Sequence, residues 1–146
     1  MGVVIRYEID DPEVDRALVR RTARSILRLI GRTKDELSIL FVDGPMMREL
    51  NRDYRGIDRT TDVLAFPQEE GPPVPGQSER VLGDIVVSIP KAKLQAGRYR
   101  HSLHDEIRRL LVHGAVHLCG YDHKTAAQAK AMRAEERRVL SGRERG

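Results

Sequence analysis

Tryptophan is absent from the chain, and aromatic residues make up only 4% of its 146 residues. A binding surface built from many stacked aromatic rings is therefore disfavoured. No apolar run approaches the roughly 18 residues that a membrane-spanning helix needs. We also find no internal repeat at periods of about 20 to 50 residues, which argues against a solenoid or propeller.

Cysteine is nearly absent as well. The one cysteine, Cys119, cannot form an intramolecular disulfide, which fits a reducing compartment. Residues 1–11 carry acidic side chains and lack the apolar segment of a secretory signal. These features predict a cytoplasmic protein that does not associate with membranes.

The overall composition is that of a globular protein, with 40% hydrophobic and 33% charged residues. The length suits one domain, which we predict to span residues 1–146. The formal net charge is +4 and the isoelectric point is about 9.5. A basic balance weakly favours a polyanionic partner, because binding to phosphates releases counterions, but charge alone leaves nucleic acid an open question.

Local patterns predict strands and helices that partly alternate along the chain. We expect strands at residues 3–9, 37–42, 63–66 and 81–88, and helices at 12–30, 46–52, from 90, at 103–119 and at 124–140. Residues 69–79 are rich in Gly and Pro and predict a loop within the domain, and residues 141–146 predict a frayed tail. The pattern predicts an α+β fold, with a mixed sheet of about four strands packed against helices.

Three of the five histidines fall within eleven residues, at His113, His117 and His123. Four residues separate the first two, so a helix places both rings on one face, about one turn apart. Gly120 can end that helix in the left-handed conformation, and the chain can then return His123 to the same ion. Three imidazole ligands leave a fourth tetrahedral position for water, which is typical of a catalytic zinc site. Nickel, copper or iron would also accept these ligands.

The histidine spacing, with Gly120, matches the metzincin protease motif H-E-x-x-H-x-x-G-x-x-H. Gly114 stands where that motif has the glutamate that serves as general base, and glycine cannot accept a proton. Peptide hydrolysis by that route is therefore disfavoured.

Several segments resemble one family. Residues 113–123 (HGAVHLCGYDH) resemble the signature H-G-x-L-H-L-x-G-Y-D-H of the YbeY family, with Val116 in place of the usual leucine. Residues 51–56 (NRDYRG) and 60–67 (TTDVLAFP) are similar to its N-x-x-Y-R and T-D-V-L-[SA]-F-P segments, and residues 82–88 (LGDIVVS) resemble its L-G-D-I-x-I-S strand.

The resemblance implies a zinc-dependent endoribonuclease specific for single-stranded RNA, with one zinc ion per chain. It implies a role in maturation of ribosomal RNA, at the 3′ end of 16S rRNA, and in ribosome quality control. The implied partners are the small ribosomal subunit and its assembly factors, and we expect no DNA substrate. Arg55 matches the arginine that the family is thought to use in activity, although without the resemblance the first interpretation would be an exposed loop residue.

Other functions and roles remain open from the sequence. The chain is alternatively a metallopeptidase or small-molecule hydrolase, or a non-catalytic ribosome assembly factor with a structural metal. Glu106 is either a residue that orients a histidine ligand or one that pairs with Arg109. His101 is expected at the surface or in a helix cap, and Asp84 at a turn or strand end.

Overall fold

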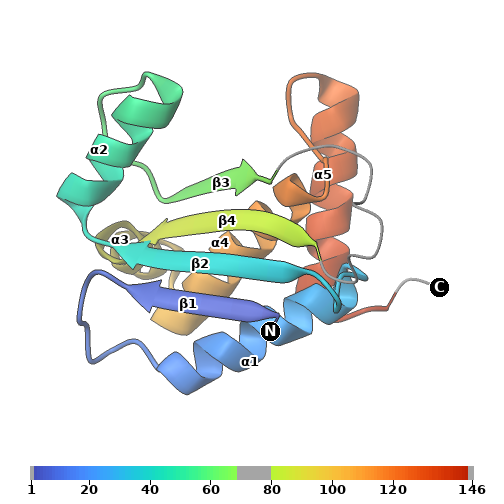
Figure 1. Ribbon diagram of the computed structural model, residues 1–146, viewed down its shortest axis with the longest axis horizontal. Helices are drawn as coiled ribbons and strands as arrows, with labels where there is room; N and C mark the ends of the chain where they lie inside the picture. The colour runs from blue at the N-terminus through green and yellow to red at the C-terminus, as the bar shows by residue number, and fades with distance from the viewer. Residues whose placement is uncertain (1, 69–79, 145–146) are drawn as a thin grey trace.

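The computed structural model describes residues 2–68 and 80–144. In these parts of the chain, four strands form one mixed sheet in the order β1-β2-β4-β3 (Figure 1). Strands β1 (Val3–Tyr7), β2 (Glu36–Val42) and β4 (Val81–Ser88) run parallel, and β3 (Val63–Pro67) runs antiparallel to β4 at one edge. Five helices accompany the sheet: α1 (Arg16–Leu29), α2 (Gly44–Arg55), α3 (Ile89–Tyr99), α4 (Leu103–Leu118) and α5 (Ala126–Leu140). The predicted α+β class is confirmed.

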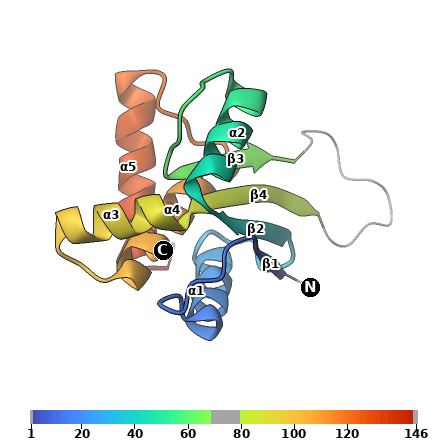
Figure 2. The ribbon, with the colours of Figure 1, turned by 90° about the vertical axis from the view of Figure 1, so that its left-hand side faces the viewer.

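The larger hydrophobic core lies between the sheet and helix α4. Helix α4 is buried around most of its circumference, by Ile107, Leu110, Leu111 and Leu118 on one side and by Val112 and Val116 on another. They pack with inward-pointing strand residues and with buried residues of α1, α3 and α5. In Figure 2, α3 and α5 lie to the left of strands β3 and β4. Helix α4 is therefore the central element of the fold, and its position is fixed from several sides.

A smaller core lies on the opposite face of the sheet, beneath helix α2. Met47 packs there against Leu64 of β3 and against Val86 of β4. Because successive strand residues point to opposite faces, Leu64 faces this smaller core whereas its neighbours Val63 and Ala65 pack against the larger one. The edge strand β3 thus has the larger core on one face and the smaller core on the other.

Some predicted boundaries are wrong. The first helix does not begin at Pro12, because the side chain of Asp15 accepts a hydrogen bond from the backbone N–H of Leu18 and caps the helix there. Helix α2 is longer than residues 46–52, since Asp43 caps its start and Gly56, with φ of 72°, ends it. Asp84 lies inside β4 with its side chain exposed, rather than at a turn or strand end.

The remaining predictions concern the loop and the tail. Residues 69–79, predicted to form a loop, lie outside the described residues. Helix α5 ends at Leu140, and the following turn is bonded back to it through the N–H groups of Gly142 and Arg143. Residues 145–146 of the predicted frayed tail also lie outside the described part. Over residues 2–68 and 80–144, no helix is long and apolar enough to cross a membrane.

Candidate active site

Helix α4 carries two of the predicted site residues at the edge of its buried face. Ser102 caps the helix, and its hydroxyl accepts a hydrogen bond from the N–H of Asp105. His113 and His117 are half-buried, between the packed stripe and solvent, as the sequence predicts. Gly114 between them packs against the sheet, because a Cβ atom there would lie 3.0 to 3.2 Å from side-chain carbons of Ile85. The histidine pair is therefore held directly over β4.

Both rings are oriented through the same nitrogen atom. The Nδ1 atom of His113 lies 2.5 Å from Oε1 of Glu136 on α5, and Nδ1 of His117 lies 3.0 Å from the backbone oxygen of Tyr121. An ionised carboxylate and a carbonyl oxygen only accept hydrogen bonds, so each Nδ1 is the protonated nitrogen. In a neutral ring this leaves the lone pair on Nε2. Two imidazole nitrogens are thus available as metal ligands.

The chain reverses after α4, as predicted. The N–H of Cys119 bonds back to the helix, and Gly120 has φ of 99°, a conformation that side-chain-bearing residues rarely adopt. The exposed ring of His123 follows, and the backbone N–H of His123 donates to Asp122 over 2.8 Å. That hydrogen bond holds the pKa of Asp122 below its ordinary value. Asp122 therefore serves as a turn cap.

A pocket of about 410 Å³ brings the predicted site residues together. Its wall is formed by α4, by the turn after α4, by β3 and by the end of α2. The lining residues are Arg55, Val63, Leu64, Ala65, His113, Gly114, His117, Asp122, His123 and Lys124. Three imidazoles and the carboxylate of Asp122 share this pocket with one guanidinium and one ammonium group, and these two cationic groups suit an anionic substrate.

Arg55 reaches the pocket from the last residue of α2. Its side chain is exposed and forms no hydrogen bond or ion pair with residues 2–68 or 80–144. Gly56, which follows it, turns the chain away in the left-handed conformation. The guanidinium group is therefore free to contact a ligand in the pocket.

The chemistry of the donors fits a metal, but a complete cage is not formed. Within residues 2–68 and 80–144, no group of three His, Cys, Asp or Glu side chains is close enough together to hold an ion. His113 is oriented by a carboxylate and His117 by a backbone carbonyl oxygen. Histidine ligands of metal ions are ordinarily oriented by hydrogen bonds of these two kinds. The third ring, His123, lies on the exposed turn that lines the same pocket.

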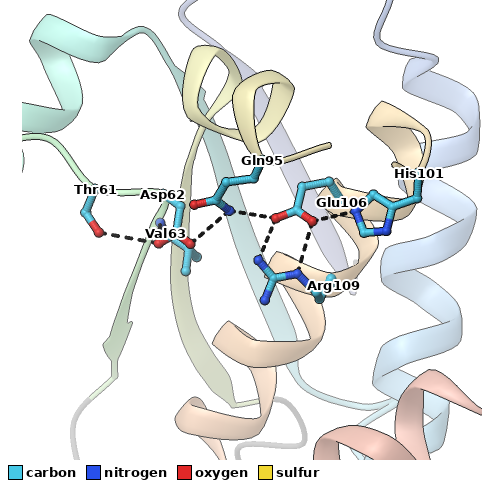
Figure 3. A network of polar contacts seen from close by, with 7 residues as sticks. All are labelled: Thr61, Asp62, Val63, Gln95, His101, Glu106 and Arg109. Carbon is cyan, nitrogen blue, oxygen red and sulfur yellow. Dashed lines mark hydrogen bonds and ion pairs between the residues drawn. The ribbon is translucent and has the colours of Figure 1, made fainter. Parts of the chain in front are cut away.

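A polar network is centred on Glu106, about two turns before His113 on α4, and Figure 3 shows its members. The side chain of Glu106 is fully buried and accepts hydrogen bonds from Arg109 and Gln95. The ring of His101 lies 2.7 Å from the same carboxylate and so belongs to the network, while its backbone N–H donates to Ala96 and helps to cap α3, a cap role that we expected. Gln95 also donates to Asp62, next to β3. Glu106 thus forms the alternative ion pair, and among the described residues its hydrogen-bond partners are Gln95, His101 and Arg109 rather than His113 or His117.

The charge of Glu106 is stabilised despite its burial. Burial would raise the pKa of this carboxyl group, but hydrogen bonds from Arg109, Gln95 and His101 outweigh that effect and hold the pKa below its ordinary value. The ionised network ties α4 and α3 to the start of β3, whose Val63 and Ala65 line the pocket. It therefore supports the pocket wall without being part of it.

The sequence analysis missed Glu136, the partner of His113. Helix α5 carries many charges, and 23 residues separate the two side chains, so no local spacing connects them. One local signal could have identified Glu136. It follows buried Glu135 and precedes buried Val139 by three residues, which places it at the edge of the α5 face that packs against α4.

Comparison with known proteins identifies relatives along nearly the whole chain. A family model described as Endoribonuclease YbeY matches residues 5–144. A protein of Pelotomaculum thermopropionicum named Endoribonuclease YbeY is 46% identical over 125 residues, which cover 84% of this chain and 82% of that protein. A protein of the same name from Desulforamulus reducens is 41% identical and covers 93% of this chain and 91% of its own length.

One solved structure has a similar fold. The solution structure of TM1509 from Thermotoga maritima matches with a TM-score of 0.67 at 24% sequence identity. The match covers 96% of this chain and 87% of that protein.

Proposed function

Because the chain belongs to the YbeY family of endoribonucleases, we propose that it hydrolyses single-stranded RNA with one zinc ion held by His113, His117 and His123. The observation that carries this proposal is the shared orientation of His113 and His117. Both rings use Nδ1 for a hydrogen bond, which leaves Nε2 free beside a pocket that His123 also lines. When bound, zinc would supply Lewis acidity toward a phosphoryl oxygen and would acidify a water molecule.

The proposed role of Arg55 follows from its place at the pocket and its lack of a partner among the described side chains. A guanidinium group can donate two parallel hydrogen bonds to a phosphate, which both orients the phosphodiester and stabilises charge that develops on it. Lys124 lines the same pocket and adds a second positive charge. In this proposal, Arg55 is a catalytic residue that contacts the scissile phosphate, and Lys124 contributes to binding.

We place this activity in the maturation of ribosomal RNA, at the 3′ end of 16S rRNA, and in ribosome quality control. Family membership supports that role, and the net charge of +4 favours a polyanionic substrate. The small ribosomal subunit and its assembly factors would be the partners. A chain with one cysteine suits the reducing cytoplasm, which is where ribosomes assemble.

The peptidase alternative has little support. Gly114 occupies the position of the protease glutamate, and it is buried against Ile85. A glutamate side chain there would have to displace the core of the sheet. A peptidase would need its general base from another part of the chain.

The test is cleavage of a defined single-stranded RNA by the purified protein. We expect cleavage that stops after treatment with a chelator and returns when zinc is added. The same sequence in a perfect duplex, or as single-stranded DNA, should remain intact. His123→Ala should lose both zinc and cleavage, whereas His104→Ala is the matched control, since His104 contacts Thr22 on α1 and does not line the pocket. Cleavage that is unaffected by complete metal removal would contradict the proposal.

A further inference from the structure

A second hollow, of about 350 Å³, lies on the opposite face of the sheet from α4. Helix α2 covers only part of that face, since Val4 on β1 stays 41% exposed and Asp84 on β4 is exposed too. The hollow is lined by Leu50 and Tyr54 of α2 and by Arg6, Ser38, Leu40, Phe66, Asp84, Ile85 and Val86 of the four strands. Its volume is at the lower end of the range for small-molecule sites.

Two aromatic rings form one side of this hollow. The ring centroids of Tyr54 and Phe66 lie 5.2 Å apart, with the planes tilted by 56°. Phe66 packs against the smaller core, whereas Tyr54 remains 70% exposed, the highest value among the exposed large hydrophobic residues of the described chain. A ring this exposed contributes little to core stability. Phe66 nevertheless holds it in place, which leaves its surface available to a flat ligand.

The hollow adjoins the pocket that contains the histidines. Tyr54 lines the hollow, and the next residue, Arg55, lines the histidine pocket. The same division occurs along β3, where Ala65 lines the pocket and Phe66 lines the hollow. Since β3 is the edge strand, no further strand of the described chain blocks the path from one side to the other. An extended ligand could therefore occupy both sites by passing across β3.

Polar groups in the hollow suit the edge of a nucleobase. The strand register sets Ser38 of β2 and Phe66 of β3 on either side of Asp84 in β4. The hydroxyl group donates and accepts hydrogen bonds, and the carboxylate accepts them from amino groups such as those of adenine, cytosine and guanine. Arg6, on the far side of the hollow, forms no hydrogen bond or ion pair with another described residue and can contact a phosphate.

We infer that Tyr54 and Phe66 form a stacking site for one unpaired nucleobase of the RNA substrate, across β3 from the hydrolytic pocket. This inference rests on the proposed function and adds a substrate contact to it. An unpaired base can stack on a protein ring without the cost of breaking a base pair, so the site favours single strands over duplexes. The low aromatic content of the chain is compatible with such a site, because one base needs one exposed ring.

The test combines steady-state kinetics with a fluorescent base. We expect Tyr54→Ala to raise KM for a single-stranded RNA about 5- to 150-fold, the range for loss of one base–aromatic stack, with little change in kcat. Tyr54→Phe should behave like the wild type because it keeps the ring. Tyr99→Ala is the matched control, since Tyr99 is also exposed, at 55%, but lies on α3 and does not line the hollow.

The direct readout uses RNAs that carry 2-aminopurine at successive positions beside the cleavage site. Rapid mixing with excess wild-type protein should quench the fluorescence at one position before cleavage begins, and Tyr54→Ala should abolish that quenching. Unchanged KM and quenching in Tyr54→Ala, while the wild type still cleaves, would overturn the inference and leave the proposed function intact. If Tyr54→Ala instead binds RNA normally but loses association with ribosomal proteins, the surface serves a protein partner and the inference is wrong. If the wild type neither binds nor cleaves single-stranded RNA, the proposed function and this inference are both wrong.

Discussion

The carboxylate of Glu136 on α5 and the Nδ1 atom of His113 on α4 lie 2.5 Å apart, so two successive helices meet at one ring of the candidate metal site. The carboxylate fixes which nitrogen of His113 is protonated and increases the basicity of the other. Helix α5 therefore does more than complete the core. It determines the orientation of a residue that we propose as a zinc ligand.

We predict that Glu136→Ala lowers the affinity for zinc by about 10- to 100-fold, as is typical when a ligand loses its outer hydrogen-bond partner. Glu136→Gln should lose less, because an amide oxygen can still accept from Nδ1. A competition titration against a chromophoric chelator measures the change. Arg137→Ala is the control, since that neighbour is exposed. Equal zinc affinity in all three variants and the wild type would show that Glu136 does not position His113.

Substitution of Arg55 should impair catalysis without changing zinc binding, because in our proposal Arg55 contacts the substrate and not the ion. Arg55→Ala should keep full zinc content and lose about 100- to 1,000-fold in kcat, the usual effect of removing one group that stabilises transition-state charge. Arg55→Lys should recover only part of this, since an ammonium group cannot make two parallel bonds. Arg52→Ala, one turn earlier on α2 and paired with Asp53, is the control. Full cleavage of single-stranded RNA by Arg55→Ala would remove Arg55 from the active site.

The Glu106 network predicts a dependence of stability on pH. The pKa of Glu106 is lower in the folded chain than its ordinary value. Its stabilising contribution is therefore complete above the ordinary carboxyl pKa, about 4.3, and is lost as the pH falls below that value toward the folded-state pKa. Glu106→Gln should be less stable than the wild type by about 1 to 3 kcal/mol at neutral pH, and the difference should shrink in acid.

Urea unfolding of both proteins between about pH 7 and pH 3 checks this prediction. Other carboxyl groups titrate in the same range, but they are common to the two proteins and cancel in the difference. A difference in unfolding free energy that stays constant across the range would mean that the charge of Glu106 is not what stabilises the network.

Gly114 is predicted to be required for packing. A Cβ atom at this position would meet three carbons of Ile85 at 3.0 to 3.2 Å, and Ile85 is fully buried. Gly114→Ala should therefore cost about 1 to 2 kcal/mol through overpacking, although alanine favours the helix itself. Gly97→Ala on α3 is the matched control, because nothing lies within 4 Å of its added Cβ and it should gain stability. Thermal unfolding distinguishes them, and equal stabilisation of both would refute the packing role.

The sequence predicts the fold class and most elements because their signals are local. The strands at residues 37–42 and 81–88 are short apolar runs, and helix α4 has a clear buried stripe with His113 and His117 at its edge. The turn at Gly120 also follows from local chemistry, since glycine accepts the positive φ that ends the helix. Helix boundaries are predicted less accurately. The first helix is expected from Pro12 but begins after Asp15, because the side chain of Asp15 caps it there.

Long-range contacts could not be predicted from local patterns. The pairing of Glu136 with His113 depends on how α5 packs against α4, and the network around Glu106 depends on α3 lying beside α4. The same holds for Arg55, whose approach to the histidine pocket follows from the position of α2 across β3. Spacing along the sequence identifies which side chains have suitable chemistry, and packing determines which of them meet.

The most direct test is the coordination of zinc in the loaded protein, measured by crystallography with anomalous scattering at the zinc edge. We predict one ion per chain, bound by imidazole nitrogens of His113, His117 and His123 at about 2.0 to 2.1 Å, with a fourth position filled by solvent. An ion that leaves out His123, or one enclosed by four protein ligands, would contradict a hydrolytic zinc site.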